Sequence, residues 1–404
     1  MDTFQELLRS AKKALSEGEN FLAHDIAMKI PDGADGPSPQ KTWVMALALA
    51  RSGSLRRAQE LANALPDADD TDIMGFKSRI YKDLALAECN PERSRGFFLE
   101  AARLSTDIFR KKRAWYNGIN AAACLRMAGQ IDESRRLVCD HVLPLCMSET
   151  RKDMWLEATL GECHLLLSDF DEAARHYSRA AEMALASGSF GDFGSTLRQL
   201  KMLSASFPDK AADLWARLSL PSVCVFSGHR IDPPNAATPR FPASAEAHVR
   251  DRIDASVSRH KIALGYASCA NGGDIIFLES VLAAGGHVWV VPPFPVETTV
   301  RLSVADASGS WERRLRNVLA NPRAKLIEPE CDETGENDEI AYDFANRYLL
   351  GLARLKARAL NLPIRGLAVW DSATPQAVGN TSSAVQMWTK ANLDYETIRP
   401  EVRT

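Results

Sequence analysis

The sequence predicts a two-part fold, in which an array of helices is followed by an open parallel sheet with helices on both faces. Residues 1–217 carry helical periodicity and lack strand-like alternation. After Pro221, short runs that are apolar throughout alternate with helical stretches, which is the pattern of parallel strands covered on both faces. A chain of 404 residues is long enough for two domains. We therefore expect a helical domain at 1–217 and an α/β domain at 218–404.

The bulk composition restricts the classes of function. Hydrophobic residues make up 46% of the chain and charged residues 25%, as in globular proteins. The net charge of −3 argues against broad electrostatic capture of nucleic acid. No apolar run has the length of a membrane span, the first residues lack the layout of a signal peptide, and the eight cysteines are scattered without a C-x-x-C pair. We expect a cytoplasmic protein with reduced thiols, no membrane segment and no bound metal.

The helical half contains one clear repeat unit at residues 160–180. Small side chains stand at Gly161 and Ala173, where two antiparallel helices would cross closely. This unit resembles the tetratricopeptide repeat. The positions that would form the seam between the two helices are Leu160, Gly161, His164, Ala173, Tyr177 and Ala180.

Three looser units precede the clear one, anchored by Ala58, Ser94 and Ser134. These anchors and Ala173 are spaced by 36, 40 and 39 residues, near the tetratricopeptide period of about 34. Four or five such pairs would form a curved solenoid with a concave face, capped by residues 1–50. The alternative is a plain helical bundle. The resemblance to tetratricopeptide repeats implies a protein partner or self-assembly.

The second half reads as alternating strands and helices, which predicts crossover connections in a parallel sheet. The predicted strands are 223–226, 262–264, 288–291, 325–327 and 367–370. The predicted helices are 244–259, 273–284, 311–320, 339–360 and 381–391. A proline-rich loop at 232–242 follows the first strand. The acidic stretch at 328–339 is typical of a solvated surface loop.

Small polar turns follow several of these strands, and at the carboxyl ends of parallel strands such turns bind anions and nucleotides. The candidate binding residues are Ser227, Gly228, His229, Arg230, Gly265, Ser268, Gly272, Gly273, Asp274, Asp371, Gly379, Asn380 and Thr381. The amides of Gly272 and Gly273 would face an anion, and Arg230 would bind phosphate. The alternatives are a tight turn with a surface arginine and helix capping by Asn271 or Asp274.

One carboxylate could carry chemistry. Glu279 lies on the helix after the second turn and is either a surface residue or a catalytic carboxylate. The sequence has no Walker A loop, no G-x-G-x-x-G, no H-E-x-x-H and no nucleophile elbow around Ser268. Motifs alone therefore assign no reaction.

The stretch from Leu264 to Pro292 joins a Gly-rich turn, a helix that ends in small residues and a strand that ends in proline. Asn346 and Arg347 lie on a later helix, and a small-residue turn follows at 379–384. With these features, residues 222–398 resemble the SLOG superfamily, which includes the SMF/DprA proteins and the LOG nucleoside-phosphate hydrolases. The resemblance implies a Rossmann-like fold and a nucleotide-type ligand, with Asn346 and Arg347 in its site.

The chain departs from the LOG pattern at one point. The catalytic stretch P-G-G-x-G-T-x-x-E of the LOG enzymes has no matching glutamate here after Thr381. A binding role is therefore the leading interpretation, and a LOG-like hydrolase that cleaves a nucleotide N-glycosidic bond is the alternative. A scaffold with a vestigial sheet domain is a third interpretation.

We expect a sensor or scaffold of bacterial-type signalling, with antiphage defence as one such setting. Its C-terminal domain would bind a nucleotide or a nucleotide-derived second messenger, with no obligatory cofactor. Its helical repeats would bind a protein partner or assemble the chain into a homo-oligomer. These expectations follow from the two resemblances and from the anion-binding turns.

Overall fold

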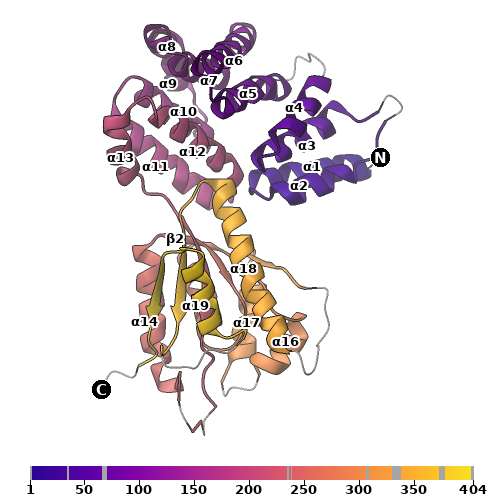
Figure 1. The fold of residues 1–404 in the computed structure, drawn as a ribbon, viewed down its shortest axis with the longest axis vertical. Coiled ribbons are helices and arrows are strands. Elements are labelled where there is room, and N and C mark those ends of the chain that lie inside the picture. The colour runs from indigo at the N-terminus through magenta and orange to yellow at the C-terminus, as the bar shows by residue number, and fades with distance from the viewer. Residues whose placement is uncertain are drawn as a thin grey trace. The chain divides into compact units, whose positions relative to one another are not determined.

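Helices occupy the first half of the computed structural model, and a sheet flanked by helices forms the second (Figure 1). The structure describes residues 2–33, 36–65, 71–233, 236–237, 239–305, 309–329, 338–372 and 378–401. The chain divides into two compact units, which are Met1–Ser219 with Ala359–Asn361 and Leu220–Arg358 with Leu362–Thr404. Most of the acidic stretch at 328–339, including Cys331, lies outside the described residues.

The first unit is a succession of antiparallel helix pairs (Figure 1). Its helices are α1 (Asp2–Ser16), α2 (Asn20–Met28), α3 (Pro39–Arg51), α4 (Leu55–Ala64), α5 (Thr71–Ala87), α6 (Pro91–Lys112), α7 (Trp115–Met127), α8 (Ile131–Leu137), the π-helical turn η1 (Val138–Val142), α9 (Leu143–Ser148), α10 (Met154–Leu166), α11 (Phe170–Ser187), α12 (Phe190–Ser204) and α13 (Pro208–Arg217). The described residues contain six pairs where the sequence predicted four or five, because residues 2–28 also fold as a pair.

Local signals fix where these helices begin. Proline is the first residue of α3, α6 and α13, where its missing N–H costs no hydrogen bond. The Asn90 side chain accepts hydrogen bonds from the backbone N–H groups of Glu92 and Arg93 and so caps α6. Asp169 caps α11 in the same way. The pairs are therefore set by start signals together with apolar seams.

The predicted close crossing of α10 and α11 is present. A Cβ added at Gly161 would lie 3.1 Å from the ring of Tyr177 and 3.3 Å from the carbonyl oxygen of Ala173. Ala173 and Tyr177 are buried. Glycine at 161 thus lets the two helix backbones approach, as a tetratricopeptide pair requires.

The second unit contains a six-stranded parallel sheet with the order β4-β3-β2-β1-β5-β6. Its strands are β1 (Ser222–Gly228), β2 (Ile262–Ala267), β3 (His287–Val290), β4 (Ala324–Leu326), β5 (Ile364–Val369) and β6 (Tyr395–Ile398). Its helices are the 3-10 turn η2 (Ala243–Ala245), α14 (Glu246–Arg259), α15 (Gly273–Ala283), α16 (Val296–Ser303), α17 (Trp311–Leu319), α18 (Asp338–Leu360) and α19 (Thr381–Lys390).

Two of these elements were absent from the sequence-based expectation. The edge strand β6 alternates in burial, with Tyr395 exposed and Ile398 buried, and it therefore lacks the continuous apolar run of a strand covered on both faces. The short helix α16 follows a proline-rich turn and carries too few turns for a clear period. The predicted fold class, helical repeats followed by an open parallel sheet, is confirmed.

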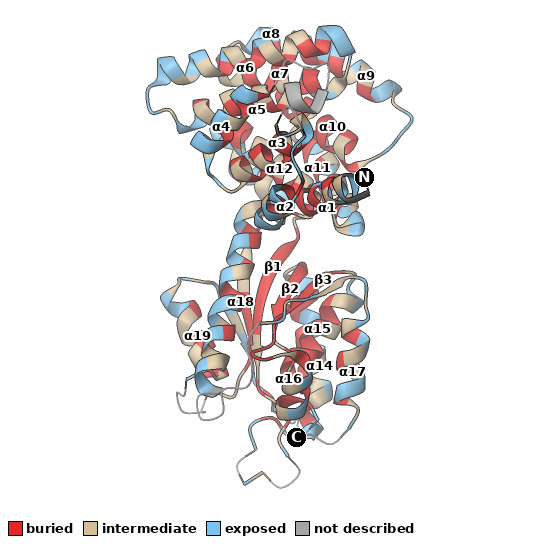
Figure 2. Cartoon of the chain, turned by 90° about the vertical axis from the view of Figure 1, so that its right-hand side faces the viewer, coloured by how far each residue is buried: buried red, intermediate tan, exposed pale blue. Residues whose placement is uncertain are grey.

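Helices cover both faces of the sheet, as Figure 2 shows, with α18 and α19 on one side and α14, α15 and α17 on the other. On one face the ring of Phe226 in β1 stacks on Phe277 of α15, with 4.5 Å between ring centroids. On the other face Lys356 of α18 lies over the ring of Trp289. The central strands are therefore buried on both sides, which explains the apolar runs of β1, β2, β3 and β5.

The strand order reverses at β1. From β1 the chain adds β2, β3 and β4 on one side, and then β5 and β6 on the other. The connections that leave β1 and those that reach β5 therefore run over opposite faces. The carboxyl ends of β1 and β5 mark the topological switch point, where sheets of this type bind ligands.

Candidate functional site

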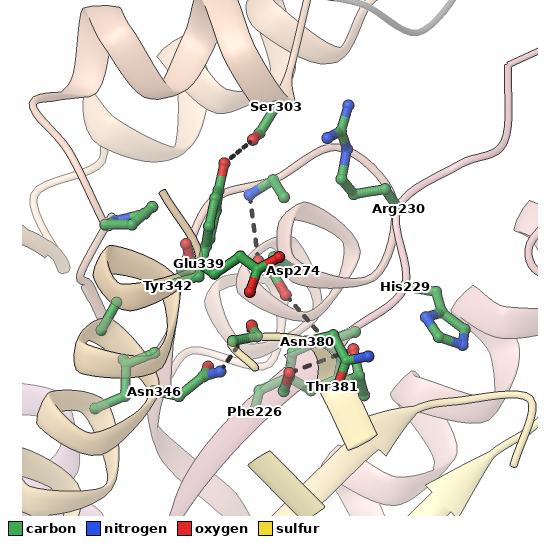
Figure 3. Close-up of a pocket in the computed structure, with 18 of the residues that line it drawn as sticks. Phe226, His229, Arg230, Asp274, Ser303, Glu339, Tyr342, Asn346, Asn380 and Thr381 are labelled. Atoms are coloured by element: carbon green, nitrogen blue, oxygen red, sulfur yellow. Dashed lines mark hydrogen bonds between the residues drawn. The ribbon is translucent and has the colours of Figure 1, made fainter. Parts of the chain in front are cut away.

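A cavity of about 330 Å³ opens at the carboxyl end of β1 (Figure 3). Its walls come from the end of β1 and the turn that follows it, from the start of α15, from α18, and from the turn before α19. Its volume lies at the lower end of the ~300–1,000 Å³ range of small-molecule sites. The candidate residues that line it are Ser227, Gly228, His229, Arg230, Ser268, Asp274, Asn346, Gly379, Asn380 and Thr381.

The glycine pair at 272–273 has a different role from the one expected. The backbone N–H of Gly273 donates to the carbonyl of His229, at 3.0 Å, so this amide is occupied inside the protein. A Cβ at Gly272 would lie 2.7 Å from the nitrogen of Ile231 and 2.9 Å from the oxygen of His229. The expectation that these amides face an anion is therefore wrong for Gly273. The pair instead lets the turn after β1 pack against the start of α15.

Four other candidates lie outside the cavity lining, namely Gly265, Glu279, Arg347 and Asp371. Gly265 falls inside β2, where an added Cβ would meet the ring of Phe277 at 3.0 Å, so packing accounts for it. Glu279 accepts hydrogen bonds from Arg250 and Arg314, which ties α15 to α14 and α17 and makes its role structural. Arg347 pairs with Asp343 one turn earlier on α18, and its side chain is 68% exposed.

His229 and Asp371 join the ends of β1 and β5 across the switch point. The Nε2 atom of His229 lies 3.1 Å from Oδ1 of Asp371. Burial lowers the pKa of His229, while its hydrogen bond to Asp371 opposes that shift. The imidazole is therefore neutral at pH 7, and Asp371 supports it without itself lining the cavity.

Asp274 places a buried carboxyl group in the cavity wall. Its oxygens accept hydrogen bonds from the backbone N–H groups of Gly228 and Ala270, each at 3.2 Å. Burial raises the pKa of Asp274 to about 7, against the opposing effect of these two hydrogen bonds and of Arg230. A carboxyl group with such a pKa exchanges its proton near neutrality.

Two guanidinium groups add positive charge to the cavity lining. Arg230 and Arg240 both line it, and the charge of Arg240 acts on Arg230 and His229. Burial is the largest cause that lowers the pKa of Arg230, but a guanidinium stays charged at neutral pH. Two guanidinium groups beside one cavity provide planar donors for a phosphate group.

Hydroxyl and amide groups converge on the rest of the wall, as Figure 3 shows. The Asn346 side chain donates to the carbonyl of Gly379 at 3.0 Å and so joins α18 to the turn before α19. Asn380 caps α19 by accepting from the N–H of Ser383, and Ser227 lies 3.5 Å from Thr381 between their hydroxyl oxygens. The helix α19 therefore begins at the cavity, and its N-terminus favours an anion there.

Sequence reasoning missed the lining residues Tyr342, Ser303 and Arg240. Tyr342 lies one turn before Asn346 on α18, and its hydroxyl oxygen is 3.0 Å from that of Ser303. Arg240 lies within the proline-rich loop at 232–242, well beyond the predicted end of the first strand at 226. The spacing of Tyr342 and Asn346 on one helix face was the only available signal for any of the three.

Among the described residues no group of three His, Cys, Asp or Glu side chains could hold a metal ion. Within the same residues, no helix has the length and hydropathy needed to cross a bilayer. Seven cysteines in the described part of the chain are free.

A model of the Tetratricopeptide Repeats-Sensor family matches residues 28–125, which run from the end of α2 into α7. The helix pairs within this range are thus of the tetratricopeptide type, which suggests a scaffold for protein interactions. No curated protein matches the chain. The resemblance of residues 222–398 to the SLOG superfamily stays a prediction.

Solved structures give weak likenesses. A thermophilic TPR protein of Thermus thermophilus is 18% identical over 50% of this chain and 98% of that one, with a TM-score of 0.38. BtubC (BKLC) from P. vanneervenii is 14% identical over 58% and 96%, with a TM-score of 0.26. Full-length LpoA from Haemophilus influenzae is 11% identical over 97% and 73%, with a TM-score of 0.23. Such scores carry no argument about function.

Proposed function

We propose that the protein is a sensor whose C-terminal unit binds a nucleotide or a nucleotide-derived messenger, and whose tetratricopeptide-type repeats bind a protein partner. The observation that carries this proposal is the position of the cavity at the β1–β5 switch point, with two guanidinium groups and several hydroxyl and amide groups in its lining. The proposal covers binding and assigns no reaction.

The chemistry of the wall supports this ligand class. Arg230 and Arg240 suit a phosphate group, and the polar side chains near Asn346 and Thr381 suit a ribose or the edge of a base. Phe226 and Leu349 add apolar surface for a ring. The resemblance to the SLOG superfamily names the same class, and the name of the matching repeat family includes the word sensor.

The test is a thermal-shift screen of the full chain with AMP, ADP, ATP, NAD and ADP-ribose, followed by calorimetry on any hit. A true ligand at a hundredfold excess over its Kd stabilises the protein by about 2.7 kcal/mol. Arg230→Ala removes a charge-assisted contact worth about 1.5–3 kcal/mol, so affinity should fall about tenfold to a hundredfold. Arg347→Ala is the matched control, because Arg347 is exposed and outside the cavity lining.

Two outcomes would overturn the proposal. One is a screen in which phosphorylated nucleotides leave the melting temperature unchanged while the protein is folded. The other is a hit whose affinity is the same for Arg230→Ala and for Arg347→Ala, since that ligand would not contact Arg230.

A second function, hydrolysis of a nucleotide N-glycosidic bond, is favoured by one observation. Asp274 is a buried carboxyl group in the cavity wall whose pKa of about 7 suits it to give or take a proton near neutrality. Chromatography of the screened mixtures would detect a released base. Release that is lost in Asp274→Asn, with binding retained, would favour the enzyme over the sensor.

A further inference from the structure

We infer that the exposed face of α18 is a self-association surface, on which α18 of a second copy of this chain packs in the antiparallel direction. This inference is independent of the ligand proposed above. The first observation is the distribution of buried and exposed side chains on α18, a helix of 23 residues with apolar side chains on both faces. Ala345, Leu349 and Ala353 are buried in the unit. The opposite face carries large apolar side chains together with Arg347, Arg354 and Arg358, and these residues are exposed.

Four large apolar side chains follow one another along that face. Their exposed fractions are 64% for Ile340, 58% for Phe344, 39% for Tyr348 and 49% for Leu355. These residues are four, four and seven positions apart. Side chains spaced by three, four or seven residues lie on one side of a helix. A stripe of this kind across successive turns, which we call the α18 stripe, is the pattern of a helix that packs against another helix.

The α18 stripe also has a gap that a partner side chain could fill. The rings of Phe344 and Tyr348 stack with 5.9 Å between centroids, so they form one aromatic block. Gly351 follows one turn later, and a Cβ added there would meet no atom within 4 Å. In an antiparallel pair centred between Tyr348 and Gly351, the ring of each Tyr348 lies over Gly351 of the partner subunit. The block and the gap are then complementary.

The charges beside the stripe favour a second copy in this direction. Glu339 and Asp343 lie near the start of α18, whereas Arg354 and Arg358 lie near its end, and all four come from one helix. Antiparallel packing brings Asp343 of each copy near the partner's Arg354. Within its own copy, Asp343 already accepts a hydrogen bond from Arg347, so it would lie between two arginines. Parallel packing would oppose like charges. Since the interface is isologous, each favourable contact occurs twice.

The expected strength follows from the size of the stripe. From Ile340 to Leu355 a helix rises by about 22 Å, at about 1.5 Å per residue. One helix pair of that length falls at the small end of specific interfaces, below about 1,200 Å². We therefore expect a weak dimer that dissociates on dilution rather than an obligate one.

The test is sedimentation velocity of the full chain across a dilution series. The unmodified chain should shift from dimer to monomer on dilution. Phe344→Ser should raise the dimer Kd about tenfold or more, while Phe21→Ser, which changes a phenylalanine that is 60% exposed on α2, should leave it unchanged. Circular dichroism of each variant confirms that it is folded.

Charge reversal makes the test specific to direction. Asp343→Arg and Arg354→Asp should each weaken the dimer, because each places like charges at the contact between positions 343 and 354. The double variant should restore the dimer, because opposite charges then face each other again at both copies of this contact. A chain that stays monomeric at every concentration would overturn the inference. A dimer that is indifferent to Phe344→Ser, or that the double charge reversal fails to restore, would also overturn it.

Discussion

Gly272, like Gly379, is a position beside the site where an added side chain should cost much stability. It has a backbone φ of +84°, which L-residues rarely adopt, and an added Cβ would lie within 2.9 Å of two backbone atoms in the turn after β1. The unusual conformation costs about 1–3 kcal/mol. Forced contact with backbone atoms adds about 1–3 kcal/mol. Gly272→Val should therefore destabilise the C-terminal unit by about 2–6 kcal/mol.

Gly285 provides the matched control. Its φ of +83° is almost the same, but an added Cβ meets only the end of the Arg323 side chain, at 3.6 Å. Gly285→Val should lose only the stability that the unusual backbone conformation costs, about 1–3 kcal/mol. Hydrogen exchange of peptides from β1 and β2 along a urea series measures this unit by itself. If the two variants lost equal stability, the turn after β1 would not be packed against Gly272.

Two further predictions concern the other unit and the response to pH. Ala173→Phe should overpack the α10–α11 crossing and lower the free energy of unfolding by about 1–3 kcal/mol, measured by chemical denaturation, whereas Ala186→Phe at an exposed position of α11 should change it little. Asp274 binds its proton more tightly in the folded state, with a pKa of about 7 against 3.8, so stability should fall as pH rises from about 4 to 7. In Asp274→Asn the melting temperature should depend less on pH over this range. An unchanged pH dependence would refute the raised pKa of a buried Asp274.

Much of the fold could be predicted because its signals are local. Strands buried on both faces appear as uninterrupted apolar runs, and the central strands β1, β2, β3 and β5 were found in that way. The edge strand β4 was also predicted, although it is at most half-buried and contains Lys325. The edge strand β6 has only one buried face, so the same criterion passed over it. The repeat unit at 160–180 was found because a glycine and an alanine must be small where α10 and α11 cross.

The candidate site was harder to predict, because a turn residue can serve either a ligand or its own backbone. The residues after β1 could be predicted to line the cavity, because open parallel sheets bind ligands at the carboxyl ends of their strands. Gly272 was expected to approach a ligand, yet the chain it approaches is the turn at 229–231. A sequence indicates that a glycine is needed and does not show what comes close to it. Tyr342 and Arg240 reach the cavity only through tertiary packing.

The helix α18 would connect the proposed ligand cavity with the proposed self-association surface through its geometry. Tyr342, Asn346 and Leu349 line the cavity from one face of the helix, and the α18 stripe lies on the other. A ligand that contacts Tyr342 and Asn346 would restrict how α18 lies on the sheet, and a partner on the stripe would restrict the same helix. If both events bias one element, each must change the affinity of the other by the same factor. In a sensor of this kind, ligand binding and self-association would be coupled through α18 alone.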